Sequence, residues 1–172
     1  MAVISAGSSL LVEPVRPRFS RLTLGLVLIA FAALLAYWVI WFFVNRDWLA
    51  NLDTPAYYAF ENAFPAADGW LALACACGAW ALWKRRPSAL FWLLVGGSAS
   101  VYLGLMDVLY DLENGIYGAP RGDWGAVATE VIINAYALGV GVWALRFGWV
   151  NRAYFLARES TATAAAPRGA GE

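Results

Sequence analysis

The sequence contains no histidine, and only two of its 172 residues are cysteine. Histidine is a common metal ligand and the usual proton carrier near neutral pH, and zinc sites are built mostly from histidine and cysteine. Its absence excludes a histidine-based metal centre and a histidine general base. Any catalysis or ion binding must therefore use carboxylates, amides, hydroxyls, tyrosines or backbone groups.

The two cysteines, Cys75 and Cys77, lie two residues apart in an apolar stretch. Two residues correspond to about 200° of helical rotation, so the thiols point to opposite faces and cannot form a disulfide within a helix. We interpret both as small apolar helix residues, a common role for free cysteine.

An excess of either charge is also missing, because 12 basic residues balance 12 acidic ones. Without a basic surface the chain has nothing to offer nucleic-acid phosphates, so a nucleic-acid partner is not expected. The sequence also lacks a glycine-rich phosphate loop, a nucleophile elbow and Cys/His metal spacing. These absences leave the ordinary soluble enzyme classes without support.

The chain has instead a large apolar content, with 62% hydrophobic residues and ten tryptophans. This composition is typical of a compact polytopic membrane protein whose partner is the lipid bilayer. Four stretches exceed the ~20 helical residues needed to cross ~30 Å of hydrocarbon. They span about 22–44, 55/66–83, 88–112 and 125–147. The apolar run of the first is longer than the ~7–15 residues of a signal peptide, so we expect a retained anchor.

The fold class predicted is all-α, an integral membrane four-helix bundle with short loops, formed by residues 21–148. All basic residues except Arg46 and Arg121 fall on one side of this arrangement. The positive-inside rule then places both termini in the cytoplasm, with tails at 1–20 and 149–172. Residues 159–172 are small and polar, and the second tail is predicted to be largely disordered. One lysine among the basic residues, with much alanine and glycine, indicates a GC-rich bacterial source and hence the bacterial inner membrane.

Five acidic residues lie within or at the edges of the last three spans, without a basic residue beside them: Glu61, Asp68, Asp107, Asp111 and Glu130. A carboxylate at mid-membrane costs at least about 2.5–3.5 kcal/mol, so an intramembrane acid indicates a functional site. Counting 100° per residue places each acid on a helix face that also carries small residues. Membrane helices approach one another at such faces, so the acids should point into the bundle.

Counting ~20 residues from each cytoplasmic end places the acids at one level near the outer membrane surface. We therefore expect an outward-facing cluster with Asp68, Asp107 and Glu130 at its core. Glu61, Asp111 and Asn134 are expected to support it. A competing interpretation is structural: Asp111, Glu113 and Asp123 would be solvated loop or cap residues. Glu130 with Asn134, and Asp107 with Ser100, would then form hydrogen bonds between helices.

Pro65 lies between Glu61 and Asp68 and removes a helical hydrogen bond to the carbonyl of Glu61. Either the second span is kinked there, or residues 54–64 form a separate interfacial helix that begins at Asp53 or Thr54. A freed carbonyl beside two acids would suit a cation.

Three functional hypotheses follow. Neighbouring acids without basic partners repel unless they are protonated or bound to cations. The first hypothesis is therefore a protein that binds or translocates a proton, a hard metal ion or a cationic amphiphile. No cofactor is evident, but oxygen ligands suit a hard divalent cation such as Ca²⁺, Mg²⁺ or Mn²⁺. Aromatic walls would suit an organic cation. Four helices are few for a transporter, so a homo-oligomer or a membrane-protein partner is expected.

The second hypothesis is an intramembrane enzyme that uses paired carboxylates as acid and base on a lipid-soluble substrate. The plan of four short-looped helices with acids in the cavity is similar to that of the sterol isomerase and sigma-2 receptor superfamily. This resemblance is architectural, and no motif carries a functional residue over. The third hypothesis is a non-catalytic accessory subunit whose small-residue faces bind another membrane protein.

Overall fold

The computed structural model describes residues 15–165, which contain helices and no strand. The long helices are α1 (Ser20–Val39), α3 (Pro65–Trp83), α4 (Ala89–Glu113) and α5 (Trp124–Val150). Shorter elements are a π-helical turn η1 (Ile40–Asn45), the 3₁₀ turns η2 (Arg46–Trp48) and η3 (Ile116–Gly118), α2 (Pro55–Glu61) and α6 (Arg152–Ala165). Four helical segments are long and apolar enough to cross a membrane: Ser20–Trp48, Pro55–Trp83, Ala89–Glu113 and Trp124–Val150. The prediction of four apolar helical segments is therefore confirmed.

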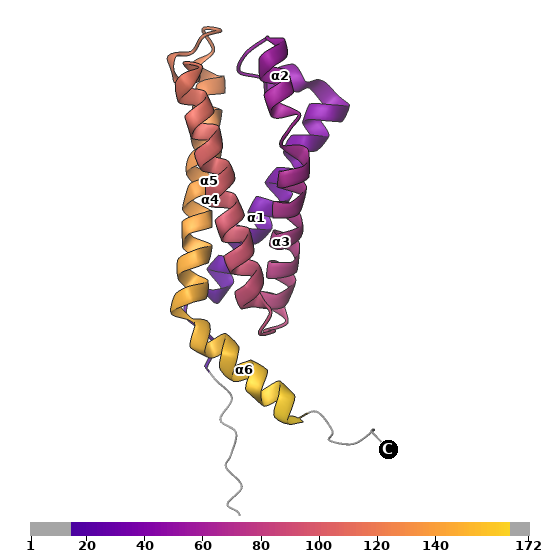
Figure 1. The fold of residues 1–172 in the computed structure, drawn as a ribbon, viewed down its shortest axis with the longest axis vertical. Coiled ribbons are helices and arrows are strands. Elements are labelled where there is room, and N and C mark those ends of the chain that lie inside the picture. The colour runs from indigo at the N-terminus through magenta and orange to yellow at the C-terminus, as the bar shows by residue number, and fades with distance from the viewer. Residues whose placement is uncertain (1–14, 166–172) are drawn as a thin grey trace, which may run out of the picture.

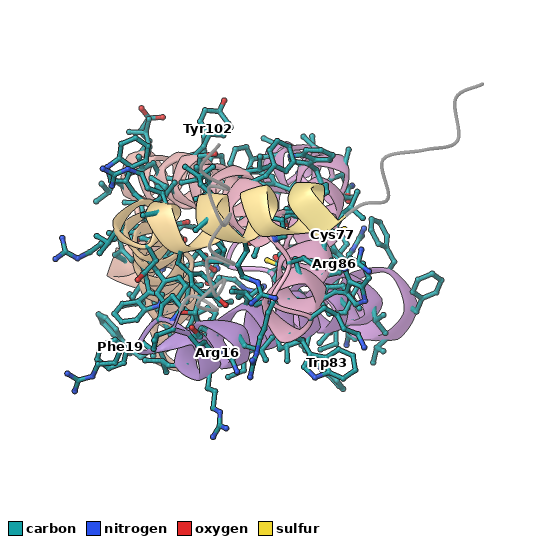
Figure 2. All side chains as sticks on the ribbon, turned by 90° about the horizontal axis from the view of Figure 1, so that it is seen from below. Arg16, Phe19, Cys77, Trp83, Arg86 and Tyr102 are labelled. Atoms are coloured by element: carbon teal, nitrogen blue, oxygen red, sulfur yellow. The ribbon has the colours of Figure 1, made fainter. Side chains whose placement is uncertain are left out.

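We describe the long helices as two pairs, α4 with α5 and α1 with α3, which separate in Figure 1. Helix α3 packs on α4 as extensively as on α1, whereas α1 and α5 touch less. The pairs approach one another at the end where α1 begins and α5 finishes, and they diverge toward the end that carries α2 (Figure 1). Arg16 and Arg86 lie at the closed end, and Phe19, Trp83 and Tyr102 lie at the periphery (Figure 2). The closed end, which carries these two arginines, is thus opposite the divergent end.

Glycines bring the long helices into close contact. A Cβ added to Gly97 of α4 would lie 2.9 Å from the carbonyl oxygen of Gly141 on α5. On the other face of α4, a Cβ on Gly96 would meet the Cβ of Ala74 at 3.4 Å. The small-residue faces therefore serve packing within the chain, as expected for closely approaching membrane helices.

Two polar contacts join α1 to α5 near the closed end. The Tyr136 hydroxyl donates to the carbonyl oxygen of Leu26 at 2.8 Å, and the indole of Trp143 donates to Thr23 Oγ1 at 3.0 Å. Both partners on α1 lie in its first two turns. Among residues 15–158, no side-chain hydrogen bond joins the remaining turns of α1 to α5. Hydrogen bonds therefore link these two helices near the closed end only.

The break at Pro65 separates α2 from α3, so residues 55–61 form a helix of their own. Thr54 Oγ1 accepts the Tyr57 N–H at 3.2 Å, and Pro55 occupies the first turn, as the sequence predicted. The prediction of a free carbonyl at Glu61 is wrong, because this oxygen accepts a hydrogen bond of 3.0 Å from the N–H of Phe64. The carbonyl oxygen of Glu61 thus already accepts one hydrogen bond in this arrangement.

The segment between α1 and α2 covers the divergent end. The Trp41 indole donates to Asn62 Oδ1 at 3.0 Å, and Arg121 donates to the carbonyl oxygen of Ala50 at 3.0 Å. The rings of Phe60 on α2 and Tyr110 on α4 stack with centroids 3.7 Å apart. These contacts connect η1, the end of α2, α4 and the loop before α5 at the divergent end.

Helix α6 corrects the prediction of a largely disordered tail at 149–172. Arg152–Ala165 is helical, and Phe155 is buried with its ring 6.5 Å from that of Phe147 on α5. Burial of Phe155 offsets part of the conformational entropy lost when this segment becomes helical. The polar composition of the residues that follow had predicted disorder. The N-terminal tail before residue 15 and the final residues 166–172 lie outside the described residues.

Candidate functional site

A cavity of about 330 Å³ lies between the helix pairs. Helices α1, α3, α4 and α5 each contribute to its wall, together with Glu61 at the end of α2. Most of the wall is apolar, including Leu34, Leu71, Leu103 and Val140. The polar part is acidic: Glu61, Asp68, Asp107 and Glu130 all line the cavity, and Asn134 lies beside them.

The structure thus brings together most of the residues that the sequence singled out. The faces assigned by helical periodicity agree with this placement for Asp68 on α3, Asp107 on α4 and Glu130 on α5. None of these carboxylates forms an ion pair with a basic side chain of the described chain. That they bind a ligand stays a prediction.

Asp107 and Glu130 form a hydrogen-bonded acidic pair. Their carboxyl groups interact directly across the contact between α4 and α5. Glu130 also accepts a hydrogen bond of 2.7 Å from the side-chain amide of Asn51. Among residues 15–158, Glu130 is the one hydrogen-bond partner of the Asp107 carboxyl group, and no N–H group donates to it. The expected bond from Ser100 is absent, because the Ser100 hydroxyl donates to the carbonyl oxygen of Ala137 at 2.7 Å.

Asn134 connects the acids of α4 and α5. Its Nδ2 atom lies 2.9 Å from Asp111 Oδ2, 3.3 Å from the Tyr117 hydroxyl and 3.5 Å from Glu130 Oε1. The side chain is only 3% exposed, and its Oδ1 atom is buried without a hydrogen-bond partner. A buried acceptor without a donor is costly, by about 1–3 kcal/mol, and such groups call for a physical explanation.

Asp111 departs from the structural interpretation, which treated it as a solvated loop residue. It is 3% exposed and bound to Asn134, because η3 folds back over the end of α4 and brings Tyr117 against it. Burial, followed by the negative charge of Asp111, raises the pKa of Tyr117 to about 12. The other two expectations hold: Asp123 caps α5 by accepting the Gly125 N–H at 2.9 Å, and Glu113 is exposed.

Two aromatic residues of α1 donate hydrogen bonds to the remaining acids. The Tyr37 hydroxyl lies 3.0 Å from Glu61 Oε2, and the Trp38 indole nitrogen lies 3.0 Å from Asp68 Oδ2. Sequence reasoning missed Tyr37, Asn51 and Tyr117 as partners. The available signal was chemical: a tyrosine or tryptophan in an apolar span needs a partner for its polar tip.

The cavity is open on one side, between α1 and α5. Ile29 of α1 and Ile132 of α5 line it and are nevertheless 57% and 67% exposed. Helices α1 and α5 are both long and apolar enough to cross a membrane. The opening therefore lies on the side surface of the helices and not at an end of the molecule.

The acids do not form a metal centre in this arrangement. Within residues 15–165, no group of three or more Cys, Asp or Glu side chains is placed to hold a metal ion. A hard divalent cation such as Ca²⁺ takes six to eight oxygen ligands as a rule. We therefore expect no tight binding of a divalent cation in this arrangement, and the sequence prediction of a hard divalent cation stays a prediction.

Comparisons with protein-family models, with curated proteins and with solved structures found no match. The cavity is therefore the feature of this chain that indicates a function.

Proposed function

We propose that this chain is a polytopic membrane protein that binds or translocates a cationic amphiphile in the cavity between its helix pairs. The main support for this proposal is that one cavity has both an apolar wall and an acidic end. Four carboxyl groups lie at that end, and no basic side chain of the described chain pairs with them. An ammonium group of the ligand would offset the repulsion between the carboxylates and the cost of their desolvation. The apolar part of the ligand would fill the apolar part of the cavity.

The size of the cavity and its aromatic residues support an organic ligand. About 330 Å³ falls at the lower end of the range of small-molecule sites. Tyr37, Trp38 and Tyr136 also line it. Aromatic rings attract cations through the negative faces of their π-systems. A small hydrated metal ion would use neither these rings nor the apolar wall.

The proposed orientation is that of a four-helix bundle with both termini in the cytoplasm and the acidic end of the cavity toward the outer surface. This orientation is supported by basic residues at the closed end of the molecule, namely Arg16, Arg18, Arg21 and those of the turn Lys84–Pro87. Positively charged loops remain on the cytoplasmic side as a rule. A bacterial inner membrane is the proposed location.

Binding of dodecylamine to the purified protein in lipid nanodiscs tests the proposal. Calorimetric titration should show saturable binding beyond that of empty nanodiscs, and dodecanol should show none. Asp107→Asn and Glu130→Gln should each weaken binding of the amine at least tenfold. Glu113→Gln is the matched control, because Glu113 is exposed and lies outside the cavity. Equal binding of amine and alcohol, or equal affinity in all variants, would overturn the proposal and favour the accessory-subunit hypothesis.

The contact of Asp107 with Glu130 supports a second candidate, an intramembrane enzyme. Two carboxyl groups in direct contact can share one proton, so that one acts as a general acid and the other as a general base. Incubation of the protein with a membrane lipid extract, followed by mass spectrometry, tests this. A product formed by the wild-type protein and lost in Asp107→Asn would support catalysis. An unchanged extract would count against it.

A further inference from the structure

The wall of the cavity carries two residues whose acceptor oxygens receive no hydrogen bond from an N–H group of the described chain. Asp107 has only another acid, Glu130, as its polar contact. The Oδ1 atom of Asn134 has no partner at all within the described chain. Both residues line the same cavity, on neighbouring helices α4 and α5. The site therefore lacks hydrogen atoms that a ligand could supply.

The donors already present are used elsewhere. Asn134 Nδ2 donates to Asp111, and the amide of Asn51 donates to Glu130. The polar tips of Tyr37 and Trp38 donate to Glu61 and Asp68. Lysine and arginine are absent from the residues that line the cavity. No neighbouring side chain is therefore free to satisfy Asp107 and Asn134.

We propose that the cationic group of the ligand is a primary or secondary ammonium whose N–H atoms bind Asp107 and the Oδ1 atom of Asn134. The inference rests on the proposed function and narrows its substrate class. A quaternary ammonium carries the same charge but has no N–H, so it leaves both acceptors unsatisfied. The terminal torsion of asparagine is soft, so a small rotation presents Oδ1 to the ligand. Asn134 thereby acts as a specificity-determining residue.

A matched pair of probes tests the inference. Dodecylamine and dodecyltrimethylammonium share chain length and charge and differ in the N–H atoms. Wild-type protein in nanodiscs should bind the amine at least about tenfold more tightly, the effect of one charge-assisted hydrogen bond. Asn134→Leu should reduce this ratio and leave the affinity for the quaternary probe nearly unchanged. Asn114→Leu is the control, because the amide of Asn114 is exposed and bonds only to Tyr110.

The outcomes separate this inference from the function on which it rests. Equal binding of the two probes to wild-type protein would overturn the N–H requirement and leave the cationic site standing. Binding of neither probe would overturn both. A preference for the amine that persists in Asn134→Leu would remove Asn134 from the site. Should Asn134→Leu fail to fold, the comparison of the probes on wild-type protein still decides whether N–H atoms are recognised.

Discussion

The side-chain amide of Asn51 donates a hydrogen bond of 2.7 Å to the carboxylate of Glu130, a residue 79 positions away in the chain. This bond joins the segment between α1 and α2 to the cavity wall on α5. Asn51 is itself buried, and its backbone N–H is bound by the hydroxyl of Tyr57. The covering segment and the acidic end of the cavity are thus one hydrogen-bonded unit.

Removing this amide should destabilise the protein. Asn51→Ala leaves a buried part of the Glu130 carboxylate without its donor, which we expect to cost about 1–3 kcal/mol. Thermal unfolding in detergent should show a lower midpoint than that of the wild-type protein. Asn114→Ala removes an exposed amide and should have little effect. Equal midpoints for the two variants would show that the covering segment is not held by this bond.

The contact between α4 and α5 should not tolerate a methyl group. In Gly97→Ala the new Cβ would lie 2.9 Å from the carbonyl oxygen of Gly141, so the helices must separate. We expect a loss of about 1–3 kcal/mol, as for other overpacked sites. Gly139→Ala is a matched control on α5, because no atom lies within 4 Å of its new Cβ. The control should be neutral or more stable by up to about 1 kcal/mol. A Gly97→Ala protein as stable as the control would contradict the close packing.

Tyr117 should ionise late. Its pKa is raised to about 12 by burial and by Asp111, against an ordinary value near 10. Because the folded state keeps the proton longer than the unfolded state, stability from this group is present below about pH 10 and lost as the pH rises toward 12. Tyrosinate absorbance should be measured as a function of pH for the wild-type protein and for Tyr117→Phe. The difference between the two curves should show the ionisation of Tyr117 near pH 12. A difference curve centred near pH 10 would place Tyr117 in open solvent.

Divalent cations should not stabilise the protein. No group of three acids within residues 15–165 is placed to hold a metal ion. Ca²⁺ or Mg²⁺ should therefore leave the thermal midpoint within error, whereas dodecylamine should raise it. Specific stabilisation follows the ratio of ligand concentration to Kd, so the midpoint should rise with amine concentration. A midpoint that rises with Mg²⁺ and falls back in Asp107→Asn would restore the metal hypothesis.

Helical arithmetic on the sequence was sufficient to place Asp68, Asp107 and Glu130 on one cavity wall, because a regular helix fixes the direction of each residue. It was insufficient for Asp111. Counting residues from the cytoplasmic end predicts depth along a helix, and it contains no information about a loop that folds back. Here η3 places Tyr117 against Asp111 and buries it.

The hydrogen-bond partners were the least predictable part of the site. Tyr37 lies in a span without charge, so no pattern distinguished it from an aromatic residue at the membrane surface. Asn51 lies in a short irregular segment, and no periodicity relates it to Glu130. Such contacts depend on tertiary structure. The helix at Arg152–Ala165 was missed for a similar reason, since burial of Phe155 against Phe147 is a contact between separate helices.

The glycine contact between α4 and α5 also has a mechanical consequence. Asp107 lies ten residues beyond Gly97, about 15 Å along the axis of α4 at 1.5 Å per residue. With Gly97 as a fulcrum, a tilt of about 5° would displace the Asp107 end by about 1.3 Å over that lever arm. That displacement is close to half the length of a hydrogen bond. The halves of these helices at the closed end therefore set the spacing of the carboxyl groups, and a substitution that never touches the ligand can change how tightly it is held.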